Sequence, residues 1–313
     1  MGNYNRKIRS IVGLLLSAIL ILAFAAAMTA CGEKASTGGS GPDISETAKY
    51  ETIFAMSFNI RTENSEDAGA RAWNERKDDV VGFILGSGAD VICLQEVRRT
   101  QYEYIRDGVE GEYGIVYYPR EDGNNPEGLA VLYGDMFELV SSDRFWLSDT
   151  PDEMGPAWGA RYNRICVSAL LRSDGGAYLN VFDVHLDHES VESQNKGIEL
   201  IMSRVEEAGY PAMMCGDFNT DENYECYKIA ASAMDDVRKT ASLYSDEADG
   251  ITYNGWGTET SPYGNLIDHI FISRDLTADT YEICDDLTAE GNYYSDHYAI
   301  MSLINVPVAE DAE

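Results

Sequence analysis

The sequence is poor in histidine, cysteine and basic residues, and each shortage excludes a class of protein. Its 313 residues include 4 His and 6 Cys, too few for a histidine-rich metal tract or a small scaffold held by many disulfides. Lys and Arg number 23 against 54 Asp and Glu, a formal net charge of −31. This charge excludes a broad basic surface that coats nucleic acid. Carboxylates and a few imidazoles must carry the chemistry.

The first 30 residues have the layout of an export signal. Positive charges at Arg6, Lys7 and Arg9 precede an uncharged run over residues 11–30 that ends in small side chains. This order is that of a signal peptide. The run is long enough to cross a bilayer, so an uncleaved transmembrane anchor is the alternative. Both interpretations place the rest of the chain outside the cytoplasm, because the positive flank stays inside.

The tetrapeptide Met28-Thr29-Ala30-Cys31 favours cleavage, because it resembles the lipobox of bacterial lipoproteins. The resemblance implies that the signal peptide, residues 1–30, is removed and that Cys31 is acylated. Residues 31–49 are rich in Gly, Ser and Thr without apolar periodicity, which indicates a flexible tether. We therefore expect an extracytoplasmic lipoprotein held to the bacterial membrane by the lipid on Cys31.

Residues 50–306 contain no repeat and no second linker, so we expect one folded domain, followed by an acidic tail at 307–313. Helical and strand patterns alternate at first and then become strand-rich, which is typical of the α/β class. Helices are expected at 74–85, 99–107, 190–208 (with Ser190 as its cap) and 224–234. Strands are expected at 54–60, 90–94, 114–118, 129–133, 164–171, 178–184, 212–215, 266–272, 281–284 and 298–304.

Lipidation of Cys31 leaves five cysteines, an odd number that cannot all form disulfides. Cys93, Cys166 and Cys215 lie inside short apolar runs, which indicates buried free thiols. A bond between Cys226 and Cys284 is the one pairing left to test.

Polar side chains follow several of the expected strands at the point where the apolar run stops. Asn59, Glu96 and His185 each follow such a run, and so do Asp217 and Asn219. Functional sites of α/β proteins gather where strands end and loops begin. Taken singly, each residue has a simpler explanation as a turn residue or an exposed strand end. Together they predict a site at one edge of the sheet structure.

Three of the four histidines directly follow an aspartate, at Asp187-His188, Asp268-His269 and Asp296-His297. A carboxylate beside an imidazole fixes its tautomer and raises its basicity, and Asp268 is expected to do this for His297. We expect His188 and His269 to be structural, because neighbouring strand residues point to opposite faces and Asp268 is needed on the inner one.

Phosphoester hydrolysis needs a cation to neutralise developing charge and a water made nucleophilic. Asn59, Glu96 and Asp296 offer the amide and carboxylate oxygens that Mg²⁺ prefers, with Mn²⁺ as the alternative. His185 is suited to bind or protonate the phosphate.

Six sequence blocks in this order resemble the endonuclease/exonuclease/phosphatase family. The blocks are Ser57-Phe58-Asn59-Ile60, Leu94-Gln95-Glu96-Val97, Asp183-Val184-His185-Leu186-Asp187, Gly216-Asp217-Phe218-Asn219, Ile267-Asp268-His269-Ile270-Phe271 and Ser295-Asp296-His297. The resemblance extends over residues 52–305. It implies a four-layer α/β sandwich, in which two mixed β-sheets pack face to face with helices outside.

The resemblance also implies a role for each site residue. Glu96 would be the principal metal ligand, with Asn59 and Asp296 beside it. Asp217 and Asn219 would orient the attacking water and a phosphate oxygen. His297, oriented by Asp268, would be the general base, with Asp217 as the other candidate. His185 would contact the phosphate and act as acid, and the guanidinium of Arg164 would bind a phosphate oxygen.

These features predict a Mg²⁺-dependent phosphoester hydrolase, and a phosphodiesterase before a monoesterase. A nuclease and an enzyme for phospholipids or sugar phosphates are both compatible with the site. Because the domain is acidic, we expect it to bind any nucleic acid weakly. We also expect a monomer. The alternative, from another functional class, is a catalytically inactive surface-binding lipoprotein of the same fold.

Overall fold

The computed structural model describes residues 49–245, 250–258, 260–261 and 264–308. The predicted signal peptide, the lipidation site Cys31 and the tether up to residue 48 lie outside the described residues, as does the acidic tail from residue 309. Within the described part of the chain, no helix is both long and apolar enough to cross a membrane.

Fourteen strands of the described chain form two mixed β-sheets. The first has the order β10-β13-β14-β1-β2-β4-β3, with β12 also paired to β14. Its strands are β10 (Leu243–Ser245), β13 (Thr280–Cys284), β14 (Ala299–Pro307), β1 (Tyr50–Asn59), β2 (Val91–Arg98), β4 (Glu127–Gly134), β3 (Tyr113–Pro119) and β12 (Thr277–Ala278). The second has the order β5-β6-β7-β8-β11-β9. Its strands are β5 (Phe137–Trp146), β6 (Ile165–Ser173), β7 (Tyr178–His185), β8 (Ala212–Asp217), β11 (Asp268–Ile272) and β9 (Asp235–Asp236).

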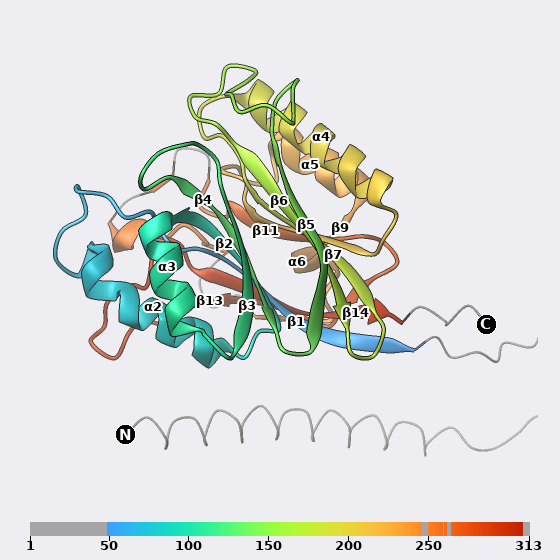
Figure 1. Ribbon diagram of the computed structural model, residues 1–313, viewed down its shortest axis with the longest axis horizontal. Coiled ribbons are helices and arrows are strands. Elements are labelled where there is room, and N and C mark those ends of the chain that lie inside the picture. The colour runs from blue at the N-terminus through green and yellow to red at the C-terminus, as the bar shows by residue number, and fades with distance from the viewer. Residues whose placement is uncertain (1–48, 246–249, 259, 262–263, 309–313) are drawn as a thin grey trace, which may run out of the picture. The chain divides into compact units, whose positions relative to one another are not determined.

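Side chains alternate along each strand between the core that lies between the two sheets and the outer face that packs against helices. In β1, Ile53 and Ala55 face the core between the sheets, whereas Met56 and Phe58 face the helices α2 (Trp73–Ser87) and α3 (Arg99–Gly108). The outer face of the second sheet packs against α4 (Val191–Ala208) and α5 (Glu225–Ala233). Figure 1 shows the two helix pairs apart from each other, each beside its own sheet. The predicted four-layer sandwich is confirmed.

Among the described residues there are also two short 3₁₀ helices and one short α-helix: η1 (Gly69–Arg71), η2 (Gly255–Gly257) and α6 (Val237–Thr240). The predicted cap of α4 is confirmed, because the Ser190 side chain accepts a hydrogen bond from the Ser193 N–H at 3.2 Å. At the other end of the chain, β14 continues to Pro307, one residue beyond the expected end of the domain.

Strand β5 was not expected from the sequence. Its polar residues Ser141, Ser142 and Asp143 hide the alternation, and a register shift between Leu139 and Ser141 breaks the period of two. β5 is an edge strand, because it pairs only with β6. An edge strand needs fewer apolar side chains than a central strand.

The proposed Cys226–Cys284 disulfide is wrong, and all five cysteines of the described chain are free. Cys226 packs with the helices outside the second sheet, whereas Cys284 packs outside the first, so two sheets separate the thiols. Cys93, Cys166 and Cys215 are buried free thiols, as predicted.

A polar link joins the sheets next to the site. The Gln95 amide donates to Oδ1 of the buried Asp183 at 2.7 Å and to Oγ of Ser57 at 3.3 Å. Oδ2 of Asp183 has no hydrogen-bond partner among the described residues. Burial therefore raises the pKa of Asp183 well above its usual value.

This raised pKa predicts a pH-dependent effect of Asp183→Asn on stability. A carboxyl group whose folded-state pKa is raised stabilises the fold at low pH, and this contribution is lost as the pH rises above about 4. The amide does not titrate, so the melting temperature of the variant relative to the wild type should increase from pH 4 to pH 8. Thermal melts of both proteins across that range test the prediction; a constant difference would contradict it.

Candidate functional site

The period of the strands places four site residues on the inner faces of the sheets, at one end. Asn59 ends β1 and His185 ends β7, each two residues beyond an inward-facing position. Asp217 ends β8, is in register with His185 and pairs with Asp268 of the antiparallel β11. Because the two inner faces meet, the Asn59 amide reaches across to Oδ2 of Asp217 at 2.9 Å.

Glu96 reaches the same place through a β-bulge. The pairing of β2 with β4 shifts between Leu94 and Val97, and Glu96 has φ +62°, a left-handed conformation that is costly for a residue other than glycine. Its Oε1 accepts from the Asn59 amide at 3.2 Å and its Oε2 from the Thr62 N–H at 2.8 Å. Burial opposes ionisation of Glu96, but Arg61 and the Thr62 N–H prevail and lower its pKa.

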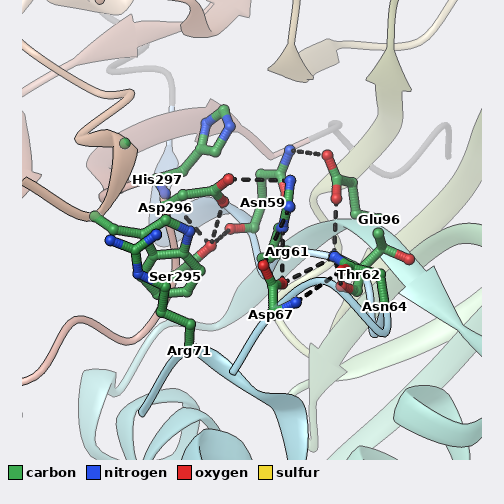
Figure 2. A network of polar contacts seen from close by, with 12 residues as sticks. Asn59, Arg61, Thr62, Asn64, Asp67, Arg71, Glu96, Ser295, Asp296 and His297 are labelled. Atoms are coloured by element: carbon green, nitrogen blue, oxygen red, sulfur yellow. Dashed lines mark hydrogen bonds and ion pairs between the residues drawn. The ribbon is translucent and has the colours of Figure 1, made fainter. Parts of the chain in front are cut away.

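Arg61 connects these residues to Asp296, and it is not among the residues that the sequence predicts. Its Nη1 lies 3.3 Å from Oδ2 of Asp296, and its Nε lies 3.1 Å from Oδ2 of Asp67. Figure 2 shows the guanidinium between Asp296 on one side and Glu96 on the other, next to Asn59. The backbone N–H of Arg61 also donates to Oδ1 of Asn59 at 3.0 Å. A basic residue two positions after Asn59, in so acidic a chain, was the available signal.

A buried arginine holds the loop that carries Arg61. The Arg76 guanidinium of α2 donates to the carbonyl oxygens of Ile60 at 2.5 Å, Arg61 at 2.7 Å and Arg71 at 2.9 Å. Burial lowers the pKa of Arg76 to about 10. The loop after β1 therefore has a fixed path past the site.

His297 and Asp268 form the expected pair. Nδ1 of His297 lies 2.9 Å from Oδ2 of Asp268, and its Nε2 lies 3.7 Å from Oδ2 of Asp217. Burial alone would lower the pKa of His297, but the charges of Asp268 and Asp217 outweigh it and raise the pKa to about 10. Burial raises the pKa of Asp217 to about 7. The two groups that were considered as general base therefore face each other.

His185 and Asn219 complete the set around Asp217. Nε2 of His185 lies 3.6 Å from Oδ2 of Asp217; burial, then the charges of Arg164 and Arg120, lower the pKa of His185 well below its usual value. The backbone N–H of Asn219 donates to Oδ1 of Asp217 at 2.8 Å, with φ +55° at Asn219. Because its pKa is lowered, His185 is a neutral imidazole at neutral pH.

The structure brings together the nine predicted site residues that it describes. A cavity of about 650 Å³ is lined by Glu96, His185, Asp217, Asn219, Asp296, His297 and Arg164. Asn59 and Asp268 lie behind this wall, where they hydrogen-bond to Glu96 and His297. The tenth residue, Cys31, lies outside the described residues. Four further residues of the wall were not predicted from the sequence: Arg61, Arg98, Arg120 and Tyr162.

The donor set fits a hard divalent cation. Ligand atoms of Glu96, His185 and Asp217 lie within 4.8 Å of one another. Glu96 is common to this group and to the ligand set expected from the sequence, in which Asn59 and Asp296 are its partners. Carboxylate and amide oxygens dominate both sets, which suits Mg²⁺ or Mn²⁺ better than a soft metal.

The two remaining histidines differ. Nε2 of His269 lies 3.0 Å from the Thr220 carbonyl oxygen, and its ring packs among aromatic side chains outside the second sheet, as a structural residue does. His188 lines the cavity, where its Nδ1 lies 3.2 Å from Nη2 of Arg164. His188, expected to be structural, thus lies at the site: it follows β7 in a loop, where strand alternation no longer applies.

Known proteins are similar to this chain in sequence and fold. Nocturnin from Mus musculus is 26% identical over 263 residues, which cover 74% of this chain and 58% of that protein. Nocturnin from Drosophila melanogaster is 28% identical over 192 residues, which cover 56% of this chain and 28% of that protein. The chain thus spans less than two thirds of the length of these curated relatives.

Solved bacterial structures match over nearly their whole length. An endonuclease/exonuclease/phosphatase from Bacteroides vulgatus has a TM-score of 0.76 and 27% identity, with 82% of this chain and 99% of that chain covered. A mannosyl-6-phosphatase from Bacteroides thetaiotaomicron has a TM-score of 0.74 and 25% identity, with 80% and 99% covered. The model of the Endonuclease/Exonuclease/phosphatase family matches residues 56–297, more than half of the sequence. The chain belongs to the endonuclease/exonuclease/phosphatase family.

Proposed function

We propose that this protein is a Mg²⁺-dependent hydrolase of phosphoester bonds. One observation carries the proposal: the His297–Asp268 pair, Asp217 and the ionised Glu96 converge at one cavity from separate strands and loops. Glu96 would hold the cation, with Asn59 and Asp296 beside it. Bound there, Mg²⁺ would neutralise developing charge on the phosphate and make a water more acidic.

The protein's own groups then divide the remaining work. The charge of a bound cation would oppose the rise in the pKa of His297 and so favour its neutral form. His297, kept in one tautomer by Asp268, or its neighbour Asp217 then takes the proton of the attacking water. Asn219 orients the phosphate from the loop after β8, and the buried Arg164 contributes a fixed positive charge. His185 is neutral, so it contacts the phosphate as a hydrogen-bonding group.

Phosphodiesters are the first substrate class that we propose, and the net charge of −31 favours small esters over polyanions. Phosphomonoesters are the second. The arginines in the cavity favour a dianionic group, and the structurally similar protein from Bacteroides thetaiotaomicron is a mannosyl-6-phosphatase. The alternative of an inactive surface-binding protein would keep the fold and bind phosphate esters without cleaving them.

A substrate screen separates these possibilities. The full chain, purified in detergent, is assayed with bis-p-nitrophenyl phosphate, p-nitrophenyl phosphate and a panel of phospholipids, sugar phosphates and oligonucleotides. Each assay contains Mg²⁺, Mn²⁺ or EDTA. We expect hydrolysis with Mg²⁺ that EDTA abolishes. Absence of turnover on every ester, with phosphate esters still bound, would favour the inactive protein.

We further propose that the hydrolase acts outside the cytoplasm, held by lipid on Cys31. The basic flank, the apolar run and the small residues before Cys31 support this location. In bacteria fed a fatty acid that carries an alkyne, the protein should become labelled, and Cys31→Ser should abolish the label and release the protein from the membrane fraction. Equal labelling of both proteins would contradict lipidation at this residue.

A further inference from the structure

Positively charged side chains gather on one part of the cavity wall. Arg98, Arg120 and Arg164 line it, and they come from the end of β2, the loop between β3 and β4, and the residue before β6. With Arg61, four guanidinium groups line one cavity of a chain with 54 acidic and 23 basic residues. The same wall carries five carboxylates as counter-charges: Glu96, Glu127, Glu189, Asp217 and Asp296.

The protein itself balances only part of this positive charge. Nη1 of Arg120 lies 2.7 Å from Oε1 of Glu127, but Nε of Arg164 is 3.9 Å from Oδ2 of Asp187, beyond hydrogen-bonding distance. Arg98 donates to two backbone carbonyl oxygens. Burial and then the charge of Arg120 lower the pKa of Arg164, so the two guanidinium groups are close enough to repel.

Hydrogen-bond donors are left over at the same place. Nε and Nη1 of Arg164 and Nε of Arg120 have no partner among the described residues, although their side chains are only 4% and 11% exposed. Buried guanidinium donors without partners cost free energy, which an anion bound beside them recovers. Phosphate matches the geometry of a guanidinium fork.

Tyr162 adds a flat surface to this wall. Its ring centroid lies 5.1 Å from Cζ of Arg120 and 5.8 Å from Cζ of Arg164. A half-buried tyrosine in a cavity wall can pack against a sugar ring or a base. The wall thus combines an anion site with a stacking site, which is the chemistry of a phosphorylated sugar or nucleoside.

Arg164 and Arg120 have different neighbours in the cavity wall. Arg164 lines the same cavity as His185 and Asp217, and its charge contributes to the lowered pKa of His185. We therefore place Arg164 at the scissile phosphate. Arg120 is anchored to Glu127 of β4. On the basis of the proposed hydrolase function, we propose that Arg120 and Tyr162 form a second anion subsite. The substrate is then a compact sugar or nucleoside phosphate with a second phosphate close to the scissile one.

Pairs of substrates that differ only in the second phosphate test this subsite. The nucleoside pair is thymidine 5′-(p-nitrophenyl phosphate) with and without a 3′-phosphate, and the sugar pair is glucose 1,6-bisphosphate against glucose 6-phosphate. With the full chain in excess Mg²⁺, we expect kcat/KM to favour the bisphosphorylated member of one pair by about 10- to 100-fold. The pair that shows the preference identifies the class of substrate.

Arg120→Gln should reduce this preference to about one. Arg172→Gln is the matched control, because Arg172 is exposed on β6 and lies outside the cavity wall, and it should keep the wild-type preference. Since Arg120→Gln leaves Glu127 buried without its partner, the double variant with Glu127→Gln removes both charges and should give the same loss. Glu127→Gln alone should increase the preference.

The outcomes separate the two proposals. Hydrolysis with a wild-type preference near one in both pairs, or a preference that Arg120→Gln leaves unchanged, overturns the subsite and leaves the hydrolase function standing. If the protein hydrolyses none of these esters and none of the p-nitrophenyl phosphates, both the hydrolase function and the subsite are overturned.

Discussion

Replacement of His297 by asparagine should lower kcat by about 10²- to 10⁴-fold, the usual contribution of a positioned general base. The imidazole faces both Asp268 and Asp217, at 2.9 and 3.7 Å. Asparagine keeps a polar group there but has no ring nitrogen that can accept and release a proton. The measurement is kcat on the best ester of the screen, together with the melting temperature.

Asp268→Asn separates positioning from proton transfer. The carboxylate accepts from Nδ1 of His297 and so leaves Nε2 free to face Asp217. An amide in its place removes the negative charge that raises the pKa of His297, so the pH profile of kcat/KM should shift toward lower pH as well as fall in height. His297 would be excluded as the base if His297→Asn and Asp268→Asn both kept the kcat, the pH profile and the melting temperature of the wild type.

Glu96→Gln should lower kcat/KM by about 10³-fold or more and weaken Mg²⁺ binding in parallel. The cation supplies several kcal/mol of transition-state stabilisation in such sites, and about 1.4 kcal/mol corresponds to a factor of ten. Glutamine keeps the size of the side chain and its hydrogen bond from Thr62 but removes the charge. Isothermal titration with Mg²⁺ and steady-state kinetics measure the two effects.

Glu138→Gln is the matched control for this variant, because Glu138 is an exposed residue of β5. It should bind Mg²⁺ and turn over substrate as the wild type does. Equal Mg²⁺ affinity of Glu96→Gln and the wild type would show that the cation is held elsewhere.

The sequence predicted the long elements and the site because both depend on local patterns. The alternation of side chains in β1 and β7 shows which face of each strand is inner, and the polar residues Asn59 and His185 lie on that face. The bulge that turns Glu96 inward was not visible, since its φ of +62° follows from the pairing of β2 with β4. Glu96 was nevertheless predicted as a ligand, because it follows an apolar run within a block that resembles the family's.

What the sequence could not predict comes from contacts between distant segments. Arg61 and Asp296 are far apart in the sequence, and only the fold brings them to 3.3 Å. Arg120 and Tyr162 likewise meet at the cavity through separate loops. His188 was misplaced for the same reason, because no strand period governs a loop. Edge strand β5 escaped because an exposed strand tolerates polar residues.

A crystal structure of the protein with Mn²⁺, with the ion located by anomalous scattering, would show which residues hold the cation. We expect an anomalous peak about 2.1 Å from a Glu96 carboxylate oxygen, within the cavity that Asp217 and His297 face. A well-ordered cavity without such a peak at saturating Mn²⁺, or a peak that Glu96 does not contact, would contradict this expectation.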